Sequence, residues 1–271
     1  MAVALLVAAT GCKRDSERRA APAPEPSCEP CAERGAAKAD RADVEVRFTP
    51  STMTLYKGLH ESLWTSKVLP RLIDALNRHY AWPKKVVVEF RDCGEVNAFY
   101  EPDGPKVIIC HDLVDHLVDV FDPHIQDQRL ADKMAVGVTA FITLHEIGHA
   151  LVDAHSIPIT GREEDAVDQL ATWLLVTHAE EGEDLALDAA RWFALAGGEG
   201  PMEGMLWDEH SLDSQRFYNI ACWVYGANPK RHAYLVEGGQ LPPERARNCD
   251  LEYQSFADSW QALLEPISAV L

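Results

Sequence analysis

One stretch of the chain, residues 132–154 (DKMAVGVTAFITLHEIGHALVDA), constrains the fold more than any other. It is largely apolar and helical in character, yet it contains His145, Glu146 and His149. Imidazole and carboxylate groups are costly to bury in an apolar helix unless a partner compensates them, and a metal ion does so. Because the two histidines are four residues apart, they lie on one helix face, where both can bind a single ion. The stretch therefore predicts a helix that carries part of a metal site.

Glu146 adds a chemical function to this pattern. Its carboxylate follows the first histidine directly, near enough to accept a proton from a water molecule held by the metal. The pattern His-Glu-x-x-His is short enough to arise by chance, so it gains its weight from the apolar helix around it. We expect His145 and His149 as ligands, Glu146 as general base, and one Zn²⁺ per chain as the metal.

A third protein ligand is then required, and the acidic run at 161–169 (GREEDAVDQ) supplies candidates. Glu164 and Asp168 are four residues apart at the start of a predicted helix that continues to about His178, so both lie on one face. One can bind the metal while the other accepts the N–H of a ligating histidine. We expect Glu164 as the ligand and Asp168 behind it, with Glu163 or Asp168 as alternative ligands. Acidic residues also stabilise a helix N-terminus, which accounts for part of this cluster.

Local patterns elsewhere predict the order of the secondary structure elements. A β-like stretch at 44–48 precedes a helix predicted over 59–80. Residues 84–90 (KKVVVEF) are β-branched and apolar, as in a strand, and 96–100 with 106–110 predict a hairpin around the turn sequence PDGP. The rest of the chain is helical in character. Strands in one half and helices in the other indicate an α+β fold with a small, mostly antiparallel sheet.

Charge and composition exclude several classes of protein. The 271 residues include 25 basic and 43 acidic ones, so the formal net charge is −18. No nucleic-acid partner is expected, because attraction to phosphates requires positive charge. The apolar share of 47% and the charged share of 25% are those of a globular protein, which excludes a disordered chain, a fibre and a multi-span membrane protein.

The N-terminal part of the chain differs from the rest. Residues 1–11 (MAVALLVAATG) are uncharged and apolar but too few to span a bilayer, which takes about 20 helical residues. They resemble the apolar part of a signal peptide without its usual basic start, and the sequence up to Cys12 resembles the lipobox of bacterial lipoproteins. Residues 12–41, rich in Ala, Pro and mixed charge, predict a disordered tether, followed by a folded domain at 42–271.

These features predict an exported envelope protein on the periplasmic or cell-surface side of a bacterial membrane, which it contacts only through a lipid on Cys12. The alternative is an apolar N-terminus without such a role.

Seven cysteines occur in the chain, and six remain when Cys12 is set aside for lipidation. In sequence order they form three neighbouring pairs: Cys28 with Cys31, Cys93 with Cys110, and Cys222 with Cys249. An oxidising compartment allows the last two pairs to bridge within the domain, although the sequence does not fix the connectivity. Cys28 and Cys31 lie in the tether without a second pair at zinc-site spacing, so cysteine ligands are not expected.

The metal-site residues resemble the pattern of the gluzincin metallopeptidases, of which thermolysin is an example. That pattern is His-Glu-x-x-His followed on the next helix by Glu-x-x-x-Asp, and it is matched by His145, Glu146, His149, Glu164 and Asp168. The resemblance implies a zincin-like fold. The gap between His149 and Glu164 is shorter than in thermolysin, and the chain shows no calcium-binding elaboration.

A second part of the resemblance concerns the substrate. Gluzincins have an edge strand with Asn-Ala-Phe and an aromatic residue, which binds extended peptide backbone, and residues 97–100 (NAFY) are similar to it. This implies Asn97 and Ala98 as substrate-binding residues.

From about Phe90 to the C-terminus, the chain more closely resembles a family of secreted bacterial metallopeptidases of uncharacterised substrate. The resemblance depends on three segments: the strand CGxxNAFY, the helix start GREED, and DEHSLDxQRFYN at 208–219.

This resemblance implies zinc-dependent hydrolysis of a peptide or protein substrate. His210 is then the expected donor that stabilises the oxyanion, because a histidine late in the chain has this role in thermolysin-like enzymes. It stands at the head of a helix predicted to continue through Trp223, where an exposed histidine without a role is the alternative. Arg216 and Tyr218 are weaker candidates for holding Asp168 or the substrate carbonyl. They can equally form a structural polar network, so they stay outside the catalytic set.

Two other classes of function remain open at this stage. One is a non-catalytic envelope protein in which zinc only locks the helices together. The other is a peptide-binding module that pairs extended chains with the strand at Asn97 by β-augmentation. Substrate specificity and oligomeric state do not follow from the sequence.

Overall fold

The computed structural model describes residues 42–197 and 206–269, which belong to one unit spanning residues 40–271. The signal-like segment, the lipidation candidate Cys12 and the tether with Cys28 and Cys31 lie outside the described residues. Strands occur in the first part of the described chain and helices dominate the second, so the expectation of a mixed α+β fold is confirmed at that level.

Four strands form one sheet in the order β1-β2-β4-β3. They are β1 (Val44–Phe48), β2 (Val86–Arg91), β3 (Ala98–Glu101) and β4 (Lys106–Cys110). β1 pairs with β2 and β2 pairs with β4 in parallel, whereas β3 runs antiparallel to β4. The hairpin is confirmed, but the prediction of a mostly antiparallel sheet is wrong.

Two connections across the sheet account for the parallel pairs. Between β1 and β2 the chain passes through α1 (Lys57–Thr65) and α2 (Val68–His79), which return it to the end of the sheet where β1 began. After β2 the chain moves to the far edge, forms β3, and turns back into β4 between β3 and β2. Local patterns identify strands but not their neighbours, so the sequence did not predict these directions.

The single helix predicted over 59–80 is also wrong, because the chain forms two helices there. They are separated at Ser66 and Lys67, and Lys67 has a left-handed backbone with φ of 59°. Pro70 lies in the first turn of α2, where its missing N–H needs no helical partner. In the interior of one long helix, the same proline would remove a backbone hydrogen bond.

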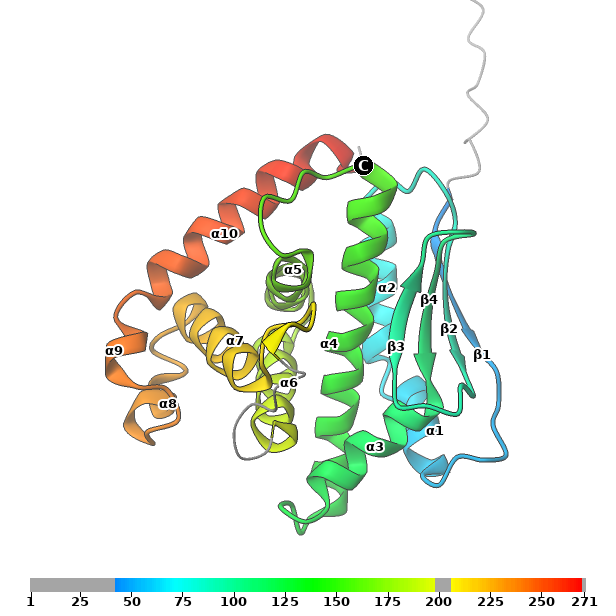
Figure 1. Ribbon diagram of the computed structural model, residues 1–271, viewed down its shortest axis with the longest axis horizontal. Coiled ribbons are helices and arrows are strands. Elements are labelled where there is room, and N and C mark those ends of the chain that lie inside the picture. Colours follow the sequence, from blue (N-terminus) through cyan, green and yellow to red (C-terminus); the bar gives the residue numbers. More distant parts are fainter. Residues whose placement is uncertain (1–41, 198–205, 270–271) are drawn as a thin grey trace, which may run out of the picture. The chain divides into compact units, whose positions relative to one another are not determined.

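The helices that follow the sheet surround a long central one. They are α3 (His111–Phe121), α4 (Gln128–His155), α5 (Glu163–His178), α6 (Gly182–Ala196), α7 (Asp213–Ala227), α8 (Ala233–Glu237), α9 (Pro243–Ala246), α10 (Cys249–Leu264) and a 3-10 turn at Glu265–Ile267. Figure 1 shows α4 between the sheet on one side and α5, α6 and α7 on the other. α4 is therefore the helix around which both layers pack.

The sheet and α4 bury their apolar surfaces against each other. In β2, Val86, Val88 and Phe90 are buried, while the residues between them are only half-buried, so one face of the sheet contacts the core. Among the described helices, α4 alone is long and apolar enough to cross a membrane, but 89% of its most apolar window is buried inside the protein. It is the core helix that the sequence predicted.

Two cysteine pairs lie at disulfide-bonding distance in the described part of the chain. Cys93, just after β2, pairs with Cys110 at the end of β4, and their Cα atoms are 5.4 Å apart. Cys222 of α7 pairs with Cys249 of α10 over a Cα distance of 5.1 Å. These are the pairs expected from sequence order, and such bonds are typical of proteins that fold in an oxidising compartment.

Candidate metal centre

Three residues of the predicted site lie within two turns of α4. His145 and Glu146 are only 3% and 7% exposed, and His149 is partly buried. The centroids of the two imidazole rings are 5.1 Å apart, as expected one turn apart on a helix. Burial raises the pKa of Glu146, against the lowering effect of the two histidines. Its carboxylate therefore takes up a proton more readily than that of an exposed glutamate.

Gly148, between the two histidines, lets α5 come close to α4. A Cβ atom at this position would lie 3.0 Å from Cβ of Val167 and 3.5 Å from Cδ2 of Leu170. The first of these distances is shorter than ordinary side-chain packing allows, so the helices approach this closely because residue 148 has no side chain. Since α5 begins at Glu163, the close packing brings its first turn beside the histidines.

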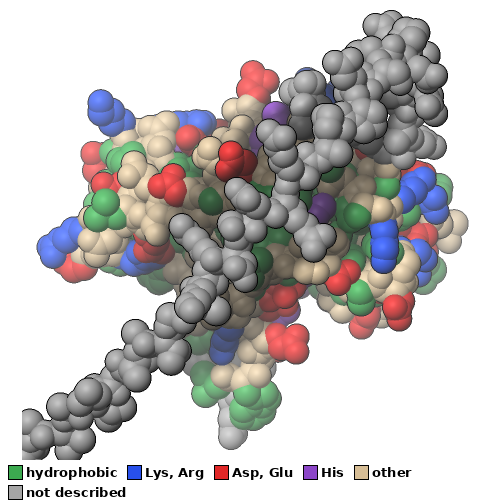
Figure 2. Space-filling model, turned by 90° about the horizontal axis from the view of Figure 1, so that it is seen from above, with side chains coloured by type: hydrophobic (Ala, Val, Ile, Leu, Met, Phe, Trp, Pro, Cys, Tyr) green, Lys and Arg blue, Asp and Glu red, His purple; other side chains and the backbone are tan. Residues whose placement is uncertain are grey.

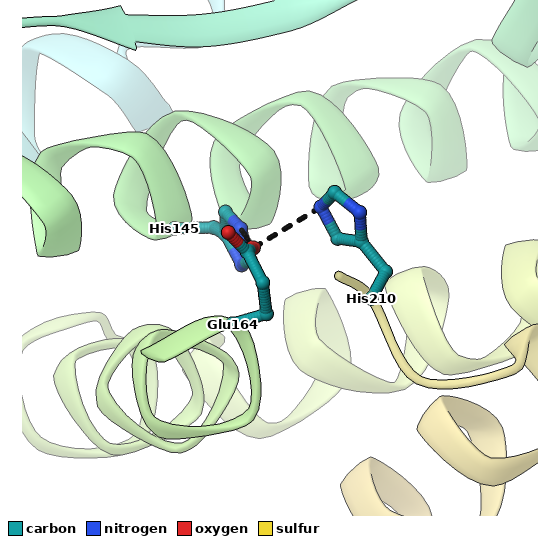
Figure 3. A group of neighbouring side chains, drawn as sticks. All are labelled: His145, Glu164 and His210. Carbon is teal, nitrogen blue, oxygen red and sulfur yellow. Dashed lines mark hydrogen bonds and ion pairs between the residues drawn. The ribbon is translucent and has the colours of Figure 1, made fainter. Parts of the chain in front are cut away.

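Three imidazole rings converge on one carboxylate oxygen, Oε2 of Glu164. Nε2 of His145 lies 3.1 Å from it, Nε2 of His149 lies 3.4 Å from it, and Nε2 of His210 lies 3.1 Å from it. Figure 3 shows His145 and His210 approaching Glu164 from different sides. The ligand atoms of His145, Glu164 and His210 all lie within 4.8 Å of one another. The structure thus brings together the predicted residues 145, 149, 164 and 210.

Each of the three rings also contacts a second carboxylate through its other nitrogen. Nδ1 of His145 lies 2.7 Å from Asp168, Nδ1 of His149 lies 2.8 Å from Glu163, and Nδ1 of His210 lies 3.1 Å from Asp208. A neutral ring that donates its Nδ1 proton to a carboxylate presents a lone pair at Nε2, which is the form that binds a metal. All three Nε2 atoms face the same point, so the arrangement suits a cation there.

Asp168 lies where the sequence placed it, behind His145. Its side chain is 4% exposed and accepts two hydrogen bonds from Arg216, at 2.8 Å from Nε and 2.7 Å from Nη2. Burial acts to raise the pKa of Asp168, but Arg216 and His145 outweigh it and hold that pKa well below its usual value. Asp168 is therefore an anion that accepts hydrogen bonds from both partners.

Glu163 and Glu164 divide their roles in the structure. Glu163 was an alternative ligand, but its carboxylate contacts Nδ1 of His149, the nitrogen that does not approach Glu164. Glu164 is the carboxylate at the centre, and hydrogen bonds from the three histidines lower its pKa far below the usual value despite burial. Burial acts to lower the pKa of His149, but Glu164 and Glu163 outweigh it and raise that pKa to about 9. The centre therefore stabilises positive charge.

His210 reaches the centre from the loop before α7 rather than from the helix itself. The predicted helix begins at Asp213, three residues later than expected. Ser211 donates a hydrogen bond of 2.6 Å to Asp165 on α5, which fixes this loop beside the first turn of that helix. The His210 ring stacks on His145 with an angle of 22° between the planes and 6.1 Å between centroids.

The chemistry of this donor set fits a zinc ion. Zinc in proteins binds imidazole nitrogen and carboxylate oxygen, with three protein ligands in catalytic sites. His145, His149 and Glu164 supply that set, and the carboxylates at the Nδ1 atoms are the partners that metal-binding histidines usually have.

A cleft of about 530 Å³ opens beside the centre. It is lined on one side by Asn97 and residues 98–100 of β3, and on the other by residues of α4 and α5 that include Glu146 and His149. β3 is the last strand of the sheet, so its outer edge has no neighbouring strand among the described residues. The predicted substrate-binding residues and the predicted general base thus share one cleft.

Among the described side chains visible in Figure 2, acidic groups are scattered between uncharged ones, and basic groups lie at several separate places. This distribution agrees with the net charge of −18.

Two contacts of the site were missed by reasoning from the sequence. Glu163 and Asp208 pair with histidine Nδ1 atoms, and the spacing of two between Asp208 and His210 was a visible signal. Arg216, a weaker candidate for holding Asp168, does bind it, from a helix 48 residues further along the chain. Tyr218, considered with Arg216, is 40% exposed.

The site is thus a set of histidines and carboxylates on two packed helices, of the kind that binds a metal ion. The chain belongs to the DUF4344 family, described as "Putative metallopeptidase", whose family model matches residues 48–264. The matched range covers β2, β3 and β4 and every residue of the centre. No curated protein and no solved structure gives a significant match.

Proposed function

We propose that this protein is a zinc-dependent peptidase that hydrolyses peptide bonds with Glu146 as general base. The observation that carries the proposal is the convergence of three Nε2 atoms on Glu164, with Glu146 buried beside them. His145, His149 and Glu164 would hold the ion, and Asp168 would orient His145. Membership in a metallopeptidase family supports the reaction class.

When bound, zinc lowers the pKa of a coordinated water to about 7 and polarises the substrate carbonyl. Glu146 takes the proton from the attacking water and delivers it to the leaving amine, a role favoured by the raised pKa of this carboxyl. Glu164 raises the pKa of His210, which favours the imidazolium form with a proton on both nitrogens. His210 would then donate one proton to Asp208 through Nδ1 and a hydrogen bond from Nε2 to the developing oxyanion.

The substrate would bind as an extended chain along β3. The free edge of this strand borders the cleft, so backbone groups near Asn97 and Ala98 can pair with a peptide as a further strand would. Such pairing holds the scissile carbonyl in a fixed position relative to Glu146.

The experiment that tests this function compares Glu146→Gln with His149→Ala in the purified chain. Bound zinc is measured by mass spectrometry of the metal, and turnover is measured on a broad library of peptides. We expect about one zinc per wild-type chain, retained without turnover in Glu146→Gln and lost in His149→Ala.

Two results would contradict the proposal. A folded wild type that takes up no zinc would exclude a metal site. A wild type that holds zinc but cleaves no peptide would favour a structural zinc site instead, and zinc-independent peptide affinity would favour a binding module.

We also propose that the protein is exported and anchored by a lipid on Cys12. The apolar segment before Cys12 and the two cysteine pairs at disulfide distance support this. Metabolic labelling with a tritiated fatty acid tests it, because Cys12→Ala should abolish the label and release the protein from the membrane fraction. Equal labelling of both chains would overturn it.

A further inference from the structure

Arg216 of α7 contacts the centre through Asp168, on the side of that carboxylate away from the proposed metal position. Its guanidinium binds both carboxylate oxygens of Asp168, at 2.7 and 2.8 Å, which is the fork geometry that fixes a carboxylate in its plane. The Arg216 side chain is only 13% exposed. A buried cation in this position has a high desolvation cost unless its partner compensates it, and Asp168 does so.

The other face of this guanidinium is also fixed. It lies 4.0 Å from the ring centroid of Phe193 on α6, a cation–π contact. Phe193 in turn packs edge-on against Phe141 of α4, with 6.3 Å between the ring centroids. Arg216 is thus held by the aromatic ring of Phe193 as well as by the carboxylate of Asp168. Because Phe193 is part of the hydrophobic core, the core fixes the position of the guanidinium.

Oδ1 of Asp168 accepts a hydrogen bond from Arg216 and another from Nδ1 of His145. A carboxylate held by a bidentate arginine cannot rotate to follow the imidazole, so the imidazole must align with the carboxylate. The contact keeps the proton of His145 on Nδ1 and leaves Nε2 directed at Glu164.

We infer that Arg216 is a positioning residue for the metal centre: through Asp168 it fixes the ring orientation and tautomer of His145, and thereby sets the affinity for the ion. This inference rests on the proposed function. Arg216 touches neither substrate nor metal in this role, and its effect passes entirely through Asp168.

The chain offers a matched control for this inference. Arg245 of α9 binds both carboxylate oxygens of Glu252 on α10, at 2.7 and 2.9 Å, and this pair includes none of the residues of the centre. Replacing either arginine breaks a bidentate pair. Of the two carboxylates, however, only Asp168, the partner of Arg216, also accepts a hydrogen bond from a histidine of the centre.

The experiment measures the zinc dissociation constant of the whole chain by competition with a chromophoric chelator, alongside the thermal midpoint. We expect Arg216→Lys and Arg216→Gln to weaken zinc binding by about tenfold or more, while Arg245→Lys changes it less than about twofold at a similar loss of thermal stability. The double variant Arg216→Gln/Asp168→Asn should bind zinc no more weakly than Asp168→Asn alone, because both residues act through one contact.

Unchanged zinc affinity in folded Arg216→Lys, or additive losses in the double variant, would overturn the inference. A wild type without zinc would instead contradict the proposed function. The conservative lysine variant keeps a positive charge beside Asp168 but loses the two-point contact of the guanidinium. Weaker zinc binding in a folded lysine variant would therefore come from the lost geometry and not from unfolding.

Discussion

His149 and Glu163 form a hydrogen bond of 2.8 Å between Nδ1 and Oε1, on the opposite side of the ring from the nitrogen that approaches Glu164. Two neighbouring glutamates therefore act on one histidine from different sides. Glu163 orients the ring of His149, whereas Glu164 lies beside Nε2 of that ring as another proposed ligand.

This division predicts different results for two adjacent substitutions. Glu164→Gln should remove a ligand and weaken zinc binding by at least about 100-fold, whereas Glu163→Gln should weaken it by only about tenfold. Both variants lose one negative charge in the same turn, so each is the control for the other. Equal losses, measured as dissociation constants by chelator competition, would contradict the assignment.

His210→Ala should separate turnover from metal binding. Loss of a donor to the oxyanion lowers kcat by about 10²- to 10³-fold, while the zinc content stays near that of the wild type. His124→Ala, at an exposed position on the loop after α3, is the control and should leave both quantities unchanged. Loss of zinc from His210→Ala would make His210 a ligand instead.

Gly148 should tolerate no larger side chain. A Cβ atom would meet Val167 at 3.0 Å, so Gly148→Val must push α5 away from α4 at an expected cost of about 1–3 kcal/mol, and must weaken zinc binding as Glu164 retreats. Gly161→Ala is the control, because nothing lies within 4 Å of a Cβ atom there. Chemical denaturation and zinc titration measure the two effects, and a fully stable valine variant would refute the close packing.

Asp188 on α6 predicts a pH dependence of stability that does not involve the metal centre. Burial raises its pKa from 3.8 to about 7, against the lowering effect of Arg191, and its side chain is almost fully buried. The folded state then binds more protons than the unfolded state between these values, so the free energy of unfolding falls as pH rises from about 4 to about 7. The fall amounts to at most about 4 kcal/mol, by 1.4 kcal/mol per pKa unit.

Asp188→Asn removes this titration while keeping the shape of the side chain. Urea denaturation of both chains at several pH values between 4.5 and 7.5 should show the smaller fall in the variant. If the free energy of unfolding changed with pH in the same way in both chains, Asp188 would have an ordinary pKa in the folded protein, and the prediction would be wrong.

The parts of the fold that the sequence predicted well are those set by local pattern. The strand at 44–48 has the expected bounds, and the helix expected to open in the acidic run at 161–169 ends at His178 as predicted. Alternation and helical periodicity are properties of neighbouring residues, so such elements can be predicted locally. The break at Lys67 was also marked locally, since Pro70 cannot lie inside a long helix.

The features that the sequence did not predict depend on contacts between distant residues. The parallel direction of β1, β2 and β4 follows from which strands become neighbours, and strand pattern alone does not encode that. Arg216 was a candidate for holding Asp168 or the substrate carbonyl, and the choice between them depends on how two helices separated by α6 pack together.

The position of α4 has a consequence for the motion of the metal centre. Amide hydrogens in a helix that is buried over most of its surface exchange with solvent mainly when the whole protein unfolds. Both histidines and Glu146 are attached to such a backbone, so the spacing between them should persist for as long as the folded state itself, in contrast to sites built on loops. Exchange at residues 144–150 should therefore be among the slowest in the chain.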